Sequence, residues 1–144
     1  MSQGMTKIGN LADLETFAKE FLAQNPEGAI VGLSGNLGAG KTTFVRACVK
    51  QLSPKERVMS PTYVLHQVYP TKPVVHHLDL YRLEQVGREQ LLELDYFSIV
   101  EAVRREKGFI FMEWPEKCKD LGVLQLKMHL KFELKGEERV IYPL

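Results

Sequence analysis

The stretch that decides the fold is AIVGLSGNLGAGKTTF, residues 29–44. Residues 35–42 within it, GNLGAGKT, fit the whole pattern G-x-x-x-x-G-K-[ST]. The apolar run 29–33 before the loop predicts a strand buried on both faces of a parallel sheet. After the loop, apolar side chains at helical spacing predict a helix that Ser53-Pro54 would end. A strand, a glycine-rich loop and a helix in this order indicate a site for phosphate groups.

Each part of the loop has an expected role. Gly35, Gly38 and Gly40 allow backbone angles that turn N–H groups toward phosphate oxygens. Lys41 would reach the β- and γ-phosphates of a nucleotide, and the Thr42 hydroxyl would bind magnesium. The expected nucleotide-binding residues are Gly35, Asn36, Leu37, Gly38, Ala39, Gly40, Lys41, Thr42 and Thr43.

Two carboxylates end apolar segments elsewhere in the chain. Asp79 follows VVHHL at the position where P-loop proteins place a residue that holds magnesium through water, although an aspartate there is also a common turn cap. Glu113 ends FIFM, and a carboxylate on such a buried strand needs an ion or a lysine as its partner. As a pair, the two carboxylates could complete a Mg–ATP site.

A possible switch lies between the loop helix and Asp79. Ser60, Pro61, Thr62 and Tyr63 occupy the interval where nucleotide switches usually carry their γ-phosphate sensor. Ser60 or Thr62 could contact phosphate or water. The alternative is a rigid proline turn with a serine cap.

The histidines suggest structural roles. They are not at the spacing of metal ligands; they are His66, His76, His77 and His129. Because successive strand residues point to opposite faces, His76 and His77 cannot both face one site.

The remaining pattern predicts the other elements of one domain. Apolar residues at helical spacing behind the N-cap Asn10 predict a helix over 11–23. Further strands are expected at 62–69, 73–80 and 109–114, with a helical region over 84–106.

Strict alternation over 124–134 predicts a half-exposed strand antiparallel to its neighbours, and Lys135-Gly136 would turn it into a partner strand over 138–142. The expected fold is α/β, a single P-loop NTPase domain over residues 1–144. Its central, mostly parallel sheet would be flanked by helices and carry a C-terminal antiparallel hairpin.

Composition excludes several classes of protein. A formal net charge of +1 over 144 residues gives no strongly basic surface for nucleic acid or membrane, so a nucleic-acid partner would be reached indirectly. No apolar run approaches the ~20 residues that span a bilayer, and the N-terminus lacks a signal sequence, so we expect a cytoplasmic protein. Cys48 and Cys118 stand alone and are expected to be structural thiols.

Four motifs in order resemble one family: GNLGAGKTTF at 35–44, SPTY at 60–63, HLDLYRL at 77–83 and EW at 113–114. The chain is similar from about residue 8 to residue 142 to the bacterial TsaE family, also called YjeE, ATPases of tRNA threonylcarbamoyladenosine biosynthesis. The stretch over 90–108 departs from the family pattern, because it lacks the usual glycine turn.

The resemblance implies roles for several residues. Residues 35–42 would bind the phosphates of ATP, with Lys41 among them, Thr42 and Glu113 would ligate Mg²⁺, and Asp79 would assist catalysis. Residues 60–63 would form a switch. The protein would hydrolyse ATP slowly alone and act with TsaB and TsaD on the adenosine beside the anticodon of tRNAs that read codons beginning with A. Trp114, the only tryptophan, would report on this site.

Other nucleotide-binding classes fit the residues less well. A GTPase would normally carry an N-K-x-D loop, and no asparagine here precedes a lysine. A small-molecule kinase remains the main alternative, although only residues 84–108 are left for its lid and acceptor pocket. A nucleotide-sensing module without catalysis is the third possibility, and the two carboxylates argue against it.

Overall fold

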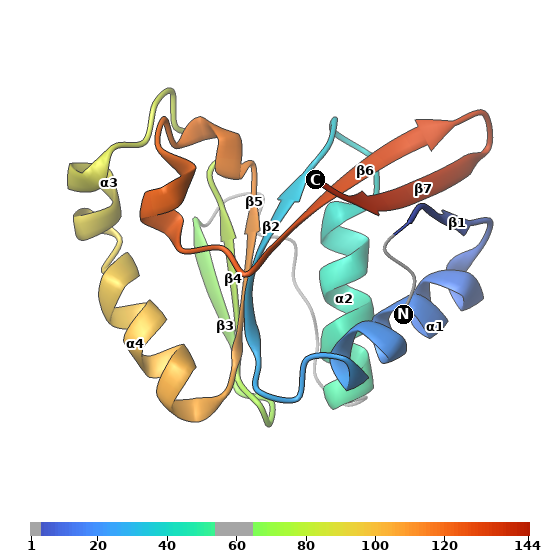
Figure 1. The fold of residues 1–144 in the computed structure, drawn as a ribbon, viewed down its shortest axis with the longest axis horizontal. Helices are drawn as coiled ribbons and strands as arrows, with labels where there is room; N and C mark the ends of the chain where they lie inside the picture. Colours follow the sequence, from blue (N-terminus) through green and yellow to red (C-terminus); the bar gives the residue numbers. More distant parts are fainter. Residues whose placement is uncertain (1–3, 54–64) are drawn as a thin grey trace.

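The computed structural model describes residues 4–53 and 65–144 (Figure 1). Its strands are β1 Thr6–Ile8, β2 Ala29–Ser34, β3 His66–Tyr69, β4 Val75–Asp79, β5 Phe109–Glu113, β6 Met128–Lys135 and β7 Glu138–Pro143. Its helices are α1 Leu11–Ala23, α2 Lys41–Leu52, α3 Arg88–Glu93 and α4 Tyr96–Glu106, with 3-10 helices η2 Pro115–Lys117 and η3 Leu121–Leu124. The described strands join one seven-stranded sheet in the order β1-β7-β6-β2-β5-β4-β3.

Helices cover both faces of this sheet, α1 and α2 on one side and α3 and α4 on the other (Figure 1). Each pair of helices covers its own cluster of buried apolar side chains. Phe44 of α2 is fully buried, and its ring centroid lies 5.7 Å from the ring centroids of Phe111 in β5 and Phe132 in β6. This aromatic packing fixes the first turn of α2 against the sheet and so positions the glycine loop that precedes it.

The strands at the centre of the sheet are parallel. β2 pairs in parallel with β5 on one side and with β6 on the other, and β4 pairs in parallel with β5. β3, β7 and β1 are antiparallel to their neighbours. Because parallel strands end at the same edge of a sheet, the carboxyl ends of β2, β5 and β4 meet beside the glycine loop, which is where open α/β sheets bind ligands.

Most of the expected architecture is confirmed. The fold is α/β, with a mixed sheet that has a parallel core and ends in the antiparallel hairpin β6–β7. Helix α1 covers the predicted range 11–23, and the side chain of its N-cap Asn10 accepts the N–H of Asp13 at 2.9 Å. Helix α2 ends before Ser53, as expected.

One strand was predicted with the wrong start and the wrong partner direction. β6 begins at Met128, not at residue 124, and it runs parallel to β2 and antiparallel only to β7. The connection through η2 and η3 carries the chain from the end of β5 back across the sheet, so that β6 enters in the direction of β2. Leu124 lies in η3 and is fully buried under α3 and α4.

Two further differences are local. The helical region over 84–106 is divided into α3 and α4 at Asp95, whose φ of 56° is left-handed and cannot continue a helix. Strand β1 was not predicted, because three residues are too short to reveal an alternation. In the part of the chain that the structure describes, no helix is long and apolar enough to cross a membrane.

Candidate active site

The glycine loop joins the end of β2 to the start of α2. Gly35 has a φ of 145° and Gly40 a φ of 108°, both in the region that favours glycine. A Cβ on Gly35 would lie 2.4 Å from the carbonyl oxygen of Phe132, so a larger residue would clash with the backbone of β6. Gly40 is the N-cap of α2 and has no side chain to bond the first-turn N–H groups, which leaves them available to an anion.

Lys41 is the first residue of α2, and its side chain lies back across the loop. Only 4% of Lys41 is exposed, its Nζ donates to the carbonyl oxygen of Gly35, and Nζ lies 3.9 Å from the ring centroid of Trp114. Burial lowers the pKa of Lys41, although the nearby carboxylates, Glu113 foremost, oppose that shift. The ammonium is therefore held in a partly desolvated position, where a phosphate would bind it strongly.

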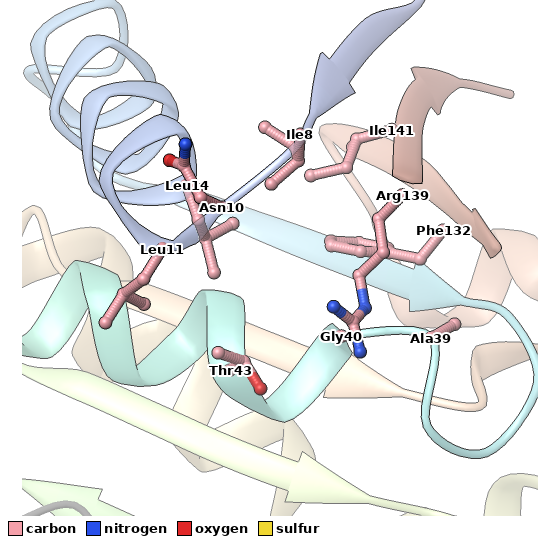
Figure 2. Close-up of a pocket in the computed structure, with 10 residues that line it drawn as sticks. All are labelled: Ile8, Asn10, Leu11, Leu14, Ala39, Gly40, Thr43, Phe132, Arg139 and Ile141. Carbon is pink, nitrogen blue, oxygen red and sulfur yellow. The ribbon is translucent and has the colours of Figure 1, made fainter. Parts of the chain in front are cut away.

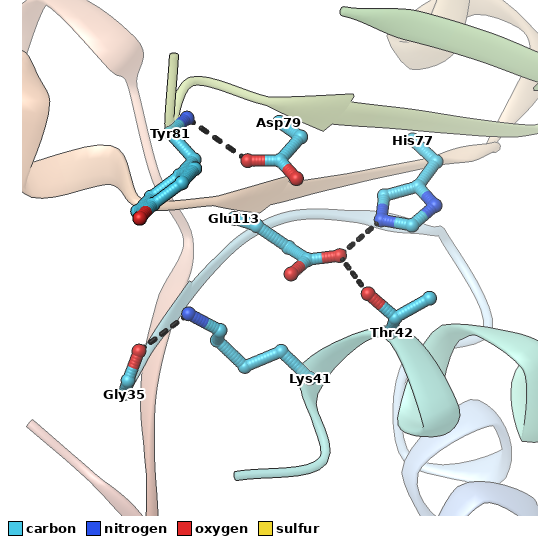
Figure 3. Close-up of polar contacts among 7 residues, drawn as sticks. All are labelled: Gly35, Lys41, Thr42, His77, Asp79, Tyr81 and Glu113. Carbon is cyan, nitrogen blue, oxygen red and sulfur yellow. Dashed lines mark hydrogen bonds and ion pairs between the residues drawn. The ribbon is translucent and has the colours of Figure 1, made fainter. Parts of the chain in front are cut away.

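Glu113 is the centre of the polar contacts in Figure 3. Its Oε2 accepts a hydrogen bond from the Thr42 hydroxyl at 2.7 Å and another from His77 Nε2 at 2.6 Å. Burial alone would raise the pKa of Glu113, but the hydrogen bonds from His77 and Thr42 and the charge of Lys41 outweigh it and hold that pKa below its ordinary value. Glu113 is therefore an ionised, buried carboxylate beside the phosphate loop.

Asp79 lies next to Glu113, because the two residues are register partners at the ends of β4 and β5. Its Oδ1 accepts the backbone N–H of Tyr81 at 2.9 Å (Figure 3). Burial raises the pKa of Asp79, and the negative charge of Glu113 adds to the shift despite the Tyr81 hydrogen bond. The Asp79 carboxylate is thus more basic than an ordinary aspartate, as suits a group that receives a proton from water.

The donor set fits magnesium better than the softer metals. Thr42 and Glu113 bring a hydroxyl and a carboxylate oxygen within hydrogen-bond distance, and Mg²⁺ is usually held by one or two such groups together with waters and substrate phosphates. Among the residues that the structure describes, no group of three or more His, Cys, Asp or Glu side chains could hold a metal. A magnesium ion here would take its remaining ligands from waters and from the phosphates of a nucleotide.

The loop residues and the two carboxylates come together, as the sequence analysis expected. Residues 35–43, Asp79 and Glu113 meet at the carboxyl ends of the parallel strands, and Trp114 follows with a left-handed φ of 61°. Leu37 at the tip of the loop is exposed, whereas Ala39 is buried. The expected switch residues Ser60, Pro61, Thr62 and Tyr63 lie outside the described residues.

His77 is a site residue that the sequence analysis missed. Its imidazole is fully buried and bonded to Glu113, whereas neighbouring His76 bonds to His66, with 2.8 Å between His76 Nδ1 and His66 Nε2. The spacing contained the signal: His77 precedes Asp79 by two residues on one strand, so both side chains leave the same face of the sheet. The alternation separated His76 from His77 correctly but did not identify which of them faces Glu113.

A pocket of about 270 Å³ opens beside the loop, between it and the hairpin β6–β7 (Figure 2). The loop and the first turn of α2 form one wall, and the hairpin β6–β7 forms the other; these walls include Ala39, Gly40, Thr43, Phe132, Arg139 and Ile141. The start of α1 closes the pocket with Leu11 and Leu14. Arg139 Nη2 donates to the carbonyl oxygen of Gly38 at 3.4 Å, so its guanidinium lies at the rim of the loop.

Comparison with known proteins places this chain in a family. The sequence profile for the threonylcarbamoyl adenosine biosynthesis protein TsaE matches residues 8–141. The chain is 34% identical over 119 residues to the tRNA threonylcarbamoyladenosine biosynthesis protein TsaE of Rickettsia prowazekii, covering 81% of this chain and 78% of that protein. With the Aquifex aeolicus protein of the same name it shares 34% over 125 residues, covering 84% of each chain.

One further sequence and one solved structure also match this chain. The TsaE protein of Nostoc is 38% identical over 91 residues, which cover 62% of this chain and 54% of that protein. The crystal structure of Bacillus subtilis YdiB superposes with a TM-score of 0.67 at 24% identity, covering 95% of this chain and 81% of that one. At that identity the YdiB match supports the fold alone. The family profile and the relatives show that this chain belongs to the TsaE family of tRNA threonylcarbamoyladenosine biosynthesis proteins.

Proposed function

We propose that the chain is a Mg²⁺-dependent ATPase that hydrolyses ATP slowly in isolation. It would act with TsaB and TsaD in threonylcarbamoylation of tRNA. The modified base would be the adenosine beside the anticodon, in tRNAs that read codons beginning with A. The observation that carries the proposal is the contact of Thr42 with Glu113 at the start of the helix that follows the glycine loop. This contact brings a hydroxyl and a carboxylate together beside the glycine loop, which supports a magnesium site for the β- and γ-phosphates of a bound nucleotide.

Each polar residue has a distinct part in this proposal. The loop N–H groups and Lys41 would bind and orient the phosphates, and Thr42 and Glu113 would hold the metal. A bound magnesium ion would neutralise charge on the phosphoryl group. Asp79, one strand away from Glu113 and more basic than usual, would orient the attacking water and accept its proton.

The pocket beside the loop suggests where the nucleoside part would bind. Glu113 and His77 lie on the β5–β4 side of β2, whereas the pocket lies on the β6–β7 side. A nucleotide with its γ-phosphate near Glu113 would therefore extend its base past Thr43 into the pocket. Phe132 and Ile141 would supply apolar contacts there, and Arg139 would lie close to the ribose or the base.

The arrangement of residues 84–108 favours an ATPase over a kinase. A small-molecule kinase would need this stretch for a lid and an acceptor pocket. Instead, α3 and α4 bury Leu91, Tyr96 and Val100 against the face of the sheet opposite α2. Because residues 84–108 pack into the core, they do not form a pocket for a small-molecule acceptor of the γ-phosphate. Water is therefore the acceptor that this site best accommodates.

The functional proposal has a direct test. Phosphate release from ATP should be slow with the purified chain and Mg²⁺, and should rise when TsaB, TsaD and tRNA are added together. No release under either condition would contradict the ATPase proposal, and release that TsaB, TsaD and tRNA leave unchanged would contradict the proposed partnership. Transfer of labelled γ-phosphate to a small molecule would instead support the kinase.

Binding of the nucleotide base in the pocket beside the loop leads to a separate prediction. Leu11→Asp should weaken ATP binding about tenfold, because it replaces an apolar wall with a charge that repels the phosphates. Leu11 is 58% exposed at the start of α1, where an acidic residue suits the helix, so the fold should persist. Leu92→Asp is the matched control, since Leu92 is 56% exposed on α3 and does not line the pocket. Calorimetric titration with ATP should distinguish the two variants, and equal affinities would place the base elsewhere.

The wider proposals concern the chain as a whole. Residues 1–144 would form a single ATPase domain, and residues 60–63 would sense the γ-phosphate. Contact with tRNA would be made through the complex and not by a basic surface of this chain, because its net charge is only +1. The place of action would be the cytoplasm, where tRNA is modified.

A further inference from the structure

The buried imidazole of His77 has no part in the roles described so far. None of its side chain is exposed, and Nε2 lies 2.6 Å from Glu113 Oε2. The other ring nitrogen, Nδ1, is buried without a partner among the described residues. The residue opposite His77 in β3 is Gln67, whose Oε1 is also buried without a partner in the described part of the chain. A polar side chain fully removed from water and bonded on one side only is costly for a purely structural role.

The contact with Glu113 sets the direction of the hydrogen bond. Glu113 Oε2 lies within hydrogen-bond distance of both the Thr42 hydroxyl and His77 Nε2, and a carboxylate oxygen can only accept. His77 must therefore carry a hydrogen on Nε2 and donate it to Oε2. Thr42 donates to the same oxygen from a different element of the fold.

Two donors on one oxygen fix the orientation of the whole carboxylate. Thr42 is attached to α2 and His77 to β4, and Glu113 lies between them on β5 (Figure 3). With Oε2 held by two donors, rotation of the carboxylate about its terminal bond would break two hydrogen bonds. Figure 3 shows the other oxygen of Glu113 turned toward Lys41 and the glycine loop, on the side where nucleotide phosphates would bind.

We infer that His77 is a positioning residue for the Mg–nucleotide site: it donates from Nε2 to Glu113 and holds that carboxylate in the orientation that a magnesium ion requires. This inference rests on the proposed function, since it assigns His77 a role in that same site. It does not make His77 a metal ligand or a base, because its Nε2 is already engaged with Glu113 and its Nδ1 is buried. Partners of this kind typically change metal affinity by 10- to 100-fold when they are removed.

Substitutions at His77 can separate the hydrogen bond from the volume of the ring. In His77→Gln the amide nitrogen takes about the place of Nε2 and can still donate to Glu113. In His77→Leu an apolar side chain fills the space without a donor, and in His77→Asn the donor is too short to reach. His76→Leu is the matched control, because it removes the bond to His66 on the other face of the same strand and does not touch Glu113.

The readout is magnesium binding and needs no turnover. With each variant saturated with ADP, Mg²⁺ is titrated while Trp114 fluorescence and the melting temperature are recorded. We expect His77→Leu and His77→Asn to need about tenfold more Mg²⁺ for the half-maximal response. His77→Gln and His76→Leu should stay within about twofold of the wild type, and affinity for ADP without magnesium should be unchanged throughout.

The outcomes separate the inference from the function on which it rests. If His77→Leu and His77→Asn titrate like the wild type, or if His77→Gln is as impaired as His77→Leu, His77 does not act through its hydrogen bond to Glu113. Should His77→Leu fail to fold, the comparison of His77→Asn with His77→Gln decides the question. If the wild type itself shows no response to magnesium and ADP, the proposed function fails first, and the inference fails with it.

Discussion

Replacement of Lys41 by alanine is expected to reduce ATP turnover by roughly 100-fold or more while the protein stays folded. Lys41 is the first residue of α2; its Nζ donates to the carbonyl oxygen of Gly35 and lies over the ring of Trp114, and a bound phosphate would be its strongest partner. Removing it would delete the charge proposed to stabilise the phosphoryl group, and it leaves no buried carboxylate unsatisfied, since Glu113 keeps its bonds to Thr42 and His77.

Stability should not fall in this variant, and it can rise. Burial lowers the pKa of Lys41, so the folded state without ligand already disfavours its charge, and alanine removes that cost. Lys50→Ala is the matched control on the same helix: Lys50 is exposed and forms only a surface ion pair with Glu15 at 3.4 Å. Phosphate-release assays and thermal melts of both variants make the comparison. Turnover by a folded Lys41→Ala protein at the wild-type rate would contradict the phosphate-binding role of the loop.

The glycine loop could be predicted in full from the sequence because its constraints are local. Gly35 needs a left-handed backbone and has no room for a Cβ, and both requirements leave glycine as the residue that fits. The apolar run before the loop and the helical spacing after it then determine the two flanking elements. The proximity of Asp79 and Glu113 could be predicted for a related reason: each ends a strand, and strand ends in a parallel sheet lie at one edge.

Contacts that depend on which strands are neighbours in the sheet could not be predicted from the sequence of any one segment. His77 contacts Glu113 because β4 and β5 are neighbours, a fact that neither segment reveals by itself. The same limit explains β6. Its alternation correctly indicated a half-exposed strand, but its direction relative to β2 depends on the path through η2 and η3. The pocket at Arg139 likewise requires the hairpin to fold back beside the loop.

Glu113→Gln is expected to raise the Mg²⁺ concentration needed for activity by at least about tenfold. It should also reduce turnover by a factor on the order of 100. Glutamine keeps the shape of the side chain, and its oxygen can still accept from Thr42 and His77, so the fold should persist. What disappears is the negative charge, and a carboxylate oxygen is the ligand that magnesium prefers to a neutral amide.

Asp79→Asn tests the proposed water-activating role separately from the proposed metal site. Asp79 lies beside Glu113, but its Oδ1 accepts from the N–H of Tyr81 and no contact joins it to Thr42 among the described hydrogen bonds. Its neutral variant should therefore lose turnover while the magnesium concentration for half-maximal response stays near that of the wild type. ATP hydrolysis measured over a range of Mg²⁺ gives both quantities for each variant. If Glu113→Gln and the wild type have equal magnesium requirements, Glu113 is not a metal ligand; if Asp79→Asn is the variant that needs more magnesium, the two carboxylates have exchanged the roles proposed for them.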